Sequence, residues 1–326
     1  MPLTGCSTAA PATGDSTAVP TGGSTSAGAL PSAAAAGGAS AFATASAFDE
    51  LAAGYDADFT AGAIGSLLRA AVWRRLGARF AAGDRVLELN CGTGEDAVHL
   101  ASRGVRVLAT DASAAMLEVA RRKAAAAGVA GAVDLRRLAI EDLAALAPAS
   151  SGRRAAPHRS DPVDAPPSAD PGPWQPPFDG ALSNFGGLNC VADLRAAAAG
   201  LAACLRPGAV AVLCVMGPLV PWEWAWFLGH GQPARAWRRL RPGGARWRGM
   251  TIRYPTVGGV RRAMAPAFRL RRAAAVGALL PPTYAEGWAR RHPALLSRLA
   301  RWERRVETWP PLPWLADHFL LELERR

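Results

Sequence analysis

Lysine, paired cysteines and long apolar runs are the features that this 326-residue sequence has least of. Its five cysteines are scattered and none forms a C-x-x-C pair, so their spacing indicates neither a disulfide framework nor a zinc site. No apolar stretch reaches the ~20 residues that a membrane-spanning helix needs. These absences favour a protein that works in the reducing cytoplasm, and they indicate no metal site.

Basic residues are also absent from the first part of the chain. Residues 1–47 consist almost entirely of Ala, Ser, Thr, Gly and Pro. Such a segment has too few large apolar side chains to offset the entropy lost on folding, so we expect a disordered tail. The letters LTGC at 3–6 match a lipoprotein cleavage box, but such a box follows a charged region and an apolar run. Only two residues precede this one, and we expect a chance match.

Positive charge is concentrated toward the other end of the chain. The net charge is +11, and from residue 235 onward there are 20 Arg against six acids. Nearly every basic residue is Arg, with Lys123 the single lysine, which indicates a compositional bias as much as a selected patch. We therefore favour a solvated basic face over a nucleic-acid interface.

Strand-like and helix-like segments alternate through the middle of the sequence. Five apolar stretches have the length and composition of buried strands: 85–90, 105–111, 133–140, 178–185 and 209–216. Four segments with helical spacing follow the first four of them: 94–104, 113–128, 141–147 and 191–205. This alternation predicts an α/β fold, a mostly parallel sheet with helices on both faces.

Two stretches interrupt the alternation. Residues 150–177 are rich in Pro, Ser, Asp and Arg without periodicity, so we expect a disordered insertion in a surface loop. Residues 217–247 are aromatic and basic and fit no strand-helix repeat, so we expect a small helical cap inserted after the fifth strand. One folded domain over residues 48–326 accommodates both.

A glycine-containing loop, VLELNCGTGEDA at 86–97, joins the first expected strand to a helix. Glycines there let the backbone approach a ligand, and the N–H groups at the helix start can hold it. The letters GTGEDA fit the dinucleotide fingerprint, so an NAD(P)-dependent oxidoreductase is one interpretation. Glu88, Glu95 and Asp96 make the loop acidic, however. Acidity disfavours a pyrophosphate and favours a ligand that carries positive charge.

Five segments in order carry a family resemblance: VLELNCGTGEDA, VLATDASAAML, LAIEDLAAL, FDGALSNFGGLN and LRPGAVAVLCVMGP. Together they resemble the class I S-adenosylmethionine-dependent methyltransferases, particularly the small-molecule branch, in detail over residues 48–218. The resemblance implies a Rossmann-like sheet of seven strands with the last antiparallel, S-adenosylmethionine as cofactor, and a small-molecule methyl acceptor. Asn90 replaces the first glycine of the family's loop, and because Asn tolerates left-handed backbone we expect the turn to survive.

The resemblance assigns the loop and the second strand to the cofactor. Glu88 and the backbone of Asn90, Gly92 and Gly94 match the loop that cradles the methionine portion. Asp111 matches the acid that accepts hydrogen bonds from both ribose hydroxyls, a task suited to a two-oxygen acceptor. The plainer interpretation of Asp111 is a cap for the following helix.

Further residues are assigned to the adenine and to the reactive end. Ala112 and Met116 match residues that lie against adenine. Asp142, or its neighbour Glu141, matches the acid that accepts from the adenine amino group, although either acid also suits a helix dipole. Asn184 and Phe185 match the wall nearest the methyl group. Tyr55 matches an aromatic residue that folds over the cofactor.

The acceptor side gives fewer signals. Trp222 and Trp226 lie one helical turn apart in the expected cap and can either line an apolar pocket or pack against the domain. If they line a pocket, an apolar or aromatic acceptor is favoured, with His230 or Glu223 as candidate catalytic bases. His318, on the last expected strand, has the weaker claim, and we expect it to be structural.

Two alternatives stay open. A non-catalytic relative that keeps the fold as a binding module is one, and the oxidoreductase above is another. A nucleic-acid methyltransferase is disfavoured because the fourth strand ends in SNFGG, without the Pro-Pro-aromatic signature of many amino-group methylating enzymes. Tryptophans beside the cap arginines also suit weak contact with an anionic membrane. The arginines concerned are Arg235, Arg238, Arg239 and Arg241.

Overall fold

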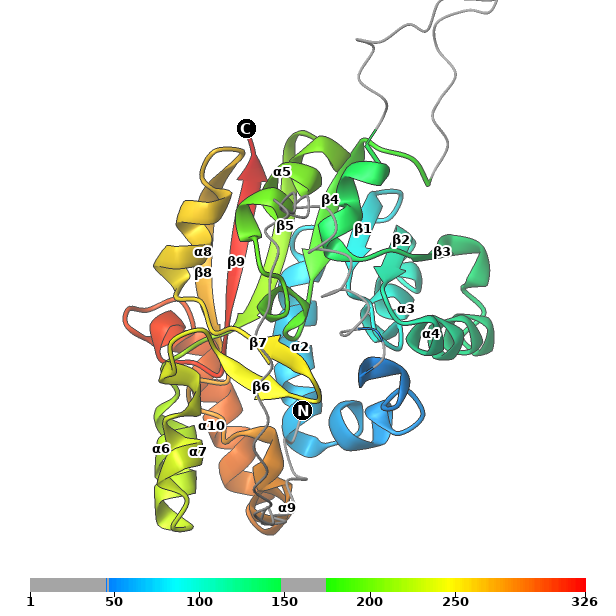
Figure 1. Ribbon diagram of the computed structural model, residues 1–326. Helices are drawn as coiled ribbons and strands as arrows, with labels where there is room; N and C mark the ends of the chain where they lie inside the picture. The colour runs from blue at the N-terminus through cyan, green and yellow to red at the C-terminus, as the bar shows by residue number, and fades with distance from the viewer. Residues whose placement is uncertain (1–44, 46, 148–173) are drawn as a thin grey trace, which may run out of the picture.

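A computed structural model describes residues 45, 47–147 and 174–326 of the chain (Figure 1). Seven strands form one sheet in the order β3-β2-β1-β4-β5-β9-β8. β9 runs antiparallel to both of its neighbours, and the other strands are parallel to one another. The expected sheet, with its antiparallel last strand, is therefore confirmed. The strands are β1 (Arg85–Leu89), β2 (Arg106–Asp111), β3 (Val133–Arg137), β4 (Phe178–Ser183), β5 (Leu205–Met216), β8 (Phe268–Val276) and β9 (His318–Arg325).

Helices cover both faces of the sheet because alternate strand residues are apolar on both sides. Leu87 and Leu89 of β1 pack toward one group of helices, whereas Val86 packs toward the other. The first group comprises η3 (Ile140–Ala145), α5 (Leu194–Cys204) and α8 (Val257–Met264). The second comprises α2 (Ala63–Gly77), α3 (Glu95–Ala101), α4 (Ala114–Ala126), α9 (Glu286–Arg291) and α10 (Pro293–Val306).

Polar side chains fix where several of these helices begin. The Ser113 hydroxyl accepts a hydrogen bond from the Met116 N–H and so caps α4. Asp193 caps α5 and Thr256 caps α8 in the same way. These caps satisfy N–H groups that have no partner inside the helix.

The strand order reverses beside β1, whose neighbours are β2 on one side and β4 on the other. Because these strands are parallel and in register, their carboxyl ends meet at one edge. Open α/β sheets bind ligands outside the carboxyl ends of the strands, at this kind of switch point. The topology thus predicts a site above β1, β2 and β4.

The segment after β5 differs in detail from the expected cap. It contains the helical elements α6 (Pro221–Gly229), α7 (Pro233–Ala236) and η5 (Arg238–Leu240), as expected. A hairpin of two short strands, β6 (Ala245–Trp247) and β7 (Met250–Ile252), follows them. The short element η3 is also a 3₁₀-helix and not an α-helix.

The remaining elements are a π-helical turn and short 3₁₀-turns: η1 (Asp56–Thr60), η2 (Ala130–Ala132), η4 (Gly187–Asn189), η6 (Thr283–Ala285) and η7 (Leu312–Trp314). The expected tail over 1–47 and insertion over 150–177 lie largely outside the described residues. Within the described part of the chain, no helix is both long and apolar enough to cross a bilayer.

Candidate functional site: two adjoining cavities

The loop after β1 turns through three residues with left-handed backbone. Asn90, Gly92 and Gly94 have φ values of +50°, +54° and +75°. The expectation that Asn90 adopts the conformation of the glycine that it replaces is confirmed, since Asn is one of the few non-glycine residues that do so readily. The loop therefore presents its backbone at the carboxyl edge despite the departure from the family pattern.

Asn90 also joins this loop to the loop after β4. Its side-chain oxygen accepts a hydrogen bond from the Ser183 hydroxyl at 2.5 Å, and its amide nitrogen donates to the Asn184 carbonyl oxygen at 2.8 Å. A Cβ placed on Gly187 would lie 2.1 Å from the Asn90 side chain. The asparagine is thus enclosed by the β4 loop, and Gly187 leaves the space that it occupies.

Asp111 lies at the end of β2, beside this loop. Its Oδ2 accepts the Gly92 N–H and its Oδ1 accepts the Ser113 N–H, both at 2.9 Å. Burial raises the pKa of Asp111, and the backbone N–H groups offset part of that rise. Since each carboxylate oxygen has a second lone pair, both oxygens can still accept from a ligand hydroxyl.

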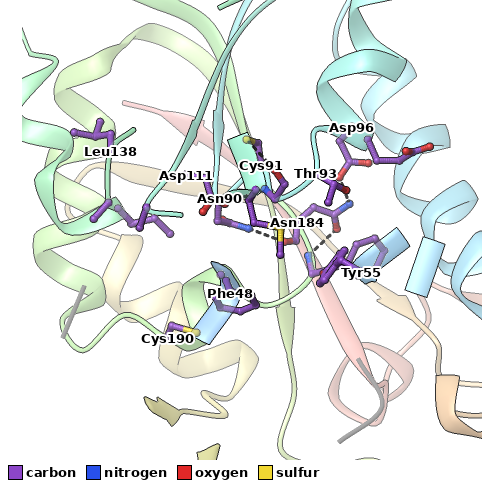
Figure 2. A pocket seen from close by; sticks show the side chains of 18 of the residues that line it. Phe48, Tyr55, Asn90, Cys91, Thr93, Asp96, Asp111, Leu138, Asn184 and Cys190 are labelled. Carbon is purple, nitrogen blue, oxygen red and sulfur yellow. Dashed lines mark hydrogen bonds between the residues drawn. The ribbon is translucent and has the colours of Figure 1, made fainter. Parts of the chain in front are cut away.

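A cavity opens beside Asp111, and we call it the loop cavity. Its volume is about 890 Å³, open solvent at the mouth included. Figure 2 shows Asn90 and Asp111 on one side of it, with Phe48 and Tyr55 below them. Nine of the cofactor residues expected from the sequence line this cavity: Tyr55, Asn90, Gly92, Asp111, Ala112, Met116, Glu141, Asn184 and Phe185.

Three other expected cofactor residues do not line the loop cavity. Asp142 is exposed beside it, so of the two neighbouring acids Glu141 is the one in the lining. At Gly94 an added Cβ would lie 2.7 Å from the Cβ of Ala120, which shows that this glycine allows α3 and α4 to approach. Glu88 is buried on β1, where burial and nearby Asp96 raise the pKa of its carboxyl well above the usual value.

A buried group around Asp96 was missed by the sequence reasoning. Oδ1 of Asp96 accepts hydrogen bonds from Arg69 at 2.8 Å and from the Trp73 ring N–H at 2.6 Å. Its Oδ2 accepts from the Asn184 amide at 2.8 Å. Arg69 and Asp96 both line the loop cavity. A signal was available: Arg69 falls on the apolar face of α2, between Leu68 and Val72.

Residues 48–56 cover the loop cavity and are held over it by polar contacts with α4 and the loop after β1. Asp56 forms an ion pair with Lys123 at 2.7 Å and accepts a hydrogen bond from the Thr93 hydroxyl at 2.7 Å. Asp49 accepts from the Ser113 hydroxyl at 2.5 Å. Tyr55 therefore lies in the cavity wall, as does the unexpected Phe48, also from this segment.

A second cavity adjoins the first, and we call it the aromatic cavity. Its volume is about 790 Å³, again with open solvent included. It shares four lining residues with the loop cavity, Phe48, Tyr55, Phe185 and Cys190. The rings that line only the aromatic cavity come from distant parts of the chain: Phe59, Trp247, Tyr254 and Tyr284, with the imidazole of His318.

An alternating chain of charges ends in the aromatic cavity. Arg239 contacts Oε2 of Glu223 through Nε and Oδ1 of Asp317 through Nη2, each at 2.6 Å. Oδ2 of Asp317 lies 3.2 Å from Nδ1 of His318. Burial alone would raise the pKa of Asp317, but Arg239 and His318 outweigh burial and lower that pKa far below its ordinary value. His318 was expected to be structural, yet it lines the cavity.

The two candidate bases from the sequence lie elsewhere. Glu223 is 1% exposed and paired with Arg238 and Arg239, so it is engaged inside the cap. His230 is exposed at the end of α6, where its Nδ1 lies 2.7 Å from the Trp226 carbonyl oxygen, outside both cavities. The geometry therefore supports neither as the group that touches an acceptor.

The cap tryptophans do not line either cavity. The Trp222 ring N–H donates to the Leu279 carbonyl oxygen at 3.0 Å. Trp226 packs on His230 and near Tyr284, with ring centroids 4.5 and 5.8 Å apart. The packing interpretation of both tryptophans thus holds, and Trp247 from the hairpin supplies the aromatic wall in their place.

Comparison with known proteins identifies the part of the chain that builds the loop cavity. The sequence of residues 86–152 matches the family described as a methyltransferase domain. This segment is similar to a methyltransferase domain. The matched segment begins in β1 and includes Asp111 and Glu141, and the resemblance to class I S-adenosylmethionine-dependent methyltransferases is confirmed.

One curated protein that part of this chain resembles is a demethylmenaquinone methyltransferase from Clavibacter sepedonicus. It is 40% identical over 83 residues, which are 25% of this chain and 33% of the relative. The match thus spans about a third of the relative's length. It does not transfer that protein's substrate to this chain.

Two solved structures are similar over most of the chain. An S-adenosylmethionine-dependent methyltransferase from Mesorhizobium loti shares 21% identity, with 78% of this chain and 98% of that chain covered and a TM-score of 0.44. A geranyl diphosphate C-methyltransferase from Streptomyces coelicolor A3(2) shares 15% identity over 79% of each chain, with a TM-score of 0.45. At these identities and TM-scores neither structure indicates a substrate.

Proposed function

We propose that this protein is an S-adenosylmethionine-dependent methyltransferase acting on a small apolar or aromatic molecule. The observation that carries the proposal is the pair of adjoining cavities at the carboxyl edge of the sheet. The loop cavity combines a glycine turn with a two-oxygen acceptor, and the aromatic cavity shares a wall with it. Cofactor and acceptor sites must adjoin in this way for a group to pass between them.

The residues of the loop cavity fit S-adenosylmethionine in two respects. A Cβ built on Gly92 would meet no atom within 4 Å, so the backbone there borders open space. Asp111 keeps one lone pair on each oxygen for a vicinal diol.

Each end of the cofactor then has residues suited to hold it. Asp111 would bind the ribose, and Arg69 would face the carboxylate of the amino-acid end. The residues suited to adenine lie in the segments that follow β2 and β3: Ala112, Met116, Leu138, Ile140 and Glu141. When bound, S-adenosylmethionine supplies a methyl group on a positively charged sulfur, which a nucleophile displaces in line.

The protein's own contribution is to orient the acceptor and to exclude water. Phe48, Tyr55 and Phe185 line both cavities and would surround the reacting atoms. Aromatic walls keep water out of the space between the two ligands. Positioning of this kind supplies much of the catalysis in a displacement that is already favourable.

Calorimetric titration with S-adenosylhomocysteine, with NAD titrated in parallel, tests the proposal. We expect micromolar binding of S-adenosylhomocysteine and no binding of NAD. Binding of NAD alone would establish the oxidoreductase suggested by the GTGEDA letters. Binding of neither would favour a non-catalytic relative of the family.

The partners of the protein belong to the same proposal. We propose a cytoplasmic setting, in keeping with four buried cysteines that are free thiols, and a small-molecule acceptor in place of nucleic acid. Weak contact with an anionic membrane is a second candidate. Two exposed tryptophans support the membrane contact: Trp302 within the arginine-rich α10 is 60% exposed, and Trp309 just after α10 is 63% exposed.

The cap arginines give the membrane proposal less support than the sequence suggested. Arg238 and Arg239 are paired with Glu223 inside the protein, so they are not available to lipid. Co-sedimentation with phosphatidylserine vesicles tests the proposal. We expect binding that weakens with added salt and with the substitution Trp302→Ala, and no binding at low salt would remove it.

A further inference from the structure

We propose that His318 is the catalytic base of the aromatic cavity and that the acceptor presents an aromatic hydroxyl to it. This inference rests on the proposed methyltransferase function. It goes beyond that function by naming the group that accepts a proton and the chemical class of the acceptor. Four observations support it: the place of His318 in the fold, its charge partners, the other titratable groups of the cavity, and the lining of the cavity.

His318 lies where the two cavities meet. It is the first residue of β9 and pairs with Met216, the last residue of β5. Because β9 is antiparallel, its beginning falls at the carboxyl edge, next to the ends of β5 and β8. The imidazole stands edge-on to Phe185, with ring centroids 5.3 Å apart, and Phe185 lines both cavities.

The charge chain orients this imidazole. Nδ1 faces the carboxylate of Asp317 at 3.2 Å, and Asp317 is held by Arg239, which Glu223 holds in turn. A carboxylate beside Nδ1 favours the tautomer with the proton on that nitrogen. Nε2 is then the nitrogen with a free lone pair, and no hydrogen bond engages it within the described part of the chain. Nδ1 and the carboxylate lie at ion-pair distance without a hydrogen bond between them. A carboxylate so placed still stabilises the imidazolium that forms when Nε2 accepts a proton.

The other titratable groups facing His318 are poorly suited to be the base. Burial raises the pKa of Tyr55 and that of Cys190 to about 12. Burial likewise raises the pKa of Tyr254 and of Tyr284. The remaining charged groups are Asp317, whose lowered pKa makes it a weak base, Glu223, and the cations Arg238 and Arg239. A histidine is the side chain whose charge ordinarily changes near neutral pH.

The lining of the aromatic cavity specifies the acceptor. Phe59, Trp247, Tyr254 and Tyr284 supply ring surfaces, and flat apolar molecules bind well among such rings. The Tyr284 hydroxyl is buried and has no hydrogen-bond partner among the described residues. It therefore offers a hydrogen bond to a second polar substituent. An aromatic ring with one hydroxyl at His318 and another polar group at Tyr284 uses all of these features.

In the proposed reaction the acceptor oxygen loses a proton and gains a methyl group. The acceptor O–H bond breaks, its proton goes to Nε2 of His318, and its electron pair remains on the oxygen. That oxygen forms a bond to the methyl carbon while the bond from carbon to the sulfonium sulfur breaks, with its electron pair left on sulfur. The products are an aromatic methyl ether, S-adenosylhomocysteine and a protonated His318, which releases its proton to water.

Binding of 4-nitrophenol to the protein saturated with S-adenosylhomocysteine tests the proton transfer without turnover. The phenolate absorbs at longer wavelength than the phenol, so absorbance reports ionisation of the bound probe. In the wild-type complex we expect the bound probe to be ionised at a lower pH than the free probe. His318→Gln should abolish this difference while S-adenosylhomocysteine affinity stays within threefold, which also shows that the variant is folded.

A matched control and a rate comparison complete the test. His292→Gln changes an exposed histidine outside both cavities and should leave the spectral shift intact. With a weakly acidic phenol and S-adenosylmethionine, His318→Gln should lose at least about 100-fold in kcat/KM, the scale of general-base catalysis. With 4-nitrophenol above its own pKa the loss should be only a few-fold, because that probe is already ionised.

Each other result contradicts a stated part of the inference. A spectral shift that survives in His318→Gln, or equal rate losses with both phenols, overturns the role of His318. Wild-type protein that binds S-adenosylhomocysteine but neither binds nor methylates any phenol overturns the acceptor class. Wild-type protein that does not bind S-adenosylhomocysteine overturns the proposed function instead.

Discussion

At the scale of single residues, cofactor affinity should depend most on Asp111. The substitution Asp111→Asn keeps the shape of the side chain but replaces one acceptor oxygen with a donor, so one ribose hydroxyl loses its partner. We expect a loss of about 1.5 to 3 kcal/mol in S-adenosylhomocysteine binding, the scale of hydrogen bonds to charged groups. Calorimetry measures it, and an unchanged Kd at unchanged Tm would mean that the ribose is held elsewhere.

Glu141 and Asp142 form a natural pair for a second comparison. The two acids are adjacent and exposed, but only Glu141 lines the loop cavity. Glu141→Gln should weaken S-adenosylhomocysteine binding several-fold, because the acceptor for the adenine amino group loses its charge. Asp142→Asn serves as the matched control and should leave the Kd unchanged. The reverse result would exchange the roles of the two acids.

How far single residues could be predicted depends on how local their signal is. Asp111 and Asn184 were predictable because Asp111 ends one strand and Asn184 directly follows another, and strand ends of a parallel sheet converge. His318 was not, because it reaches the cavity only through the antiparallel placement of β9 between β5 and β8. Phe48 was missed for a related reason: its position depends on contacts of Asp49 and Asp56 with α4 and the loop.

At the scale of elements, two glycines of one loop should respond differently to the same change. Gly94→Ala forces a residue with a Cβ into left-handed backbone, which is strained. It also brings that Cβ within 2.7 Å of the Cβ of Ala120. We expect it to lower the free energy of unfolding by about 2 to 4 kcal/mol. Gly92→Ala should lower the free energy of unfolding by only about 1 to 2 kcal/mol, the strain of left-handed backbone, because its Cβ meets no atom within 4 Å.

The effects of the two substitutions on cofactor affinity should have the opposite order to their effects on stability. The Cβ of Gly92→Ala faces open space in the lining of the loop cavity, so this variant should lose more affinity for S-adenosylhomocysteine than Gly94→Ala does. Urea denaturation and calorimetry on both variants separate the two effects. If Gly94→Ala were as stable as the wild type, the close approach of α3 and α4 would not be a constraint.

Elements with strong periodicity were predictable, and those fixed by packing were not. The strands β1, β2 and β4 are mostly apolar and largely buried, as the strands of a parallel sheet covered on both faces are. The hairpin of β6 and β7 has no such apolar run. Of its strand residues only Met250 and Ile252 are buried, and they pack against Ala47 and Cys190. Its turn relies on the left-handed Arg248 and Gly249, a pair with no strong hairpin signature at the first position.

At the scale of the whole molecule, the chain of charges from Glu223 to His318 fastens the cap to the sheet. Arg239 lies on η5 of the cap, whereas Asp317 precedes β9, and the two meet at 2.6 Å with both side chains buried. Arg239 also donates to the carbonyl oxygens of Gly217 and Asp317, at 3.2 Å each. The same contacts that position His318 therefore hold together the two parts of the protein that enclose the aromatic cavity.

Asp317→Asn tests this double role through the dependence of stability on pH. Because the folded-state pKa of Asp317 is lowered, its carboxylate contributes stability in full above its unfolded pKa of about 4, and that contribution is lost as the pH falls toward the folded-state pKa. At pH 7 we expect the variant to be about 3 kcal/mol less stable, since removing one partner leaves a buried cation less well compensated. The gap should narrow between pH 5 and pH 3 in urea denaturation. A gap that stays constant to pH 3 would show that the lost stability comes from packing and not from the ion pair, and the cap would then be held by its apolar contacts.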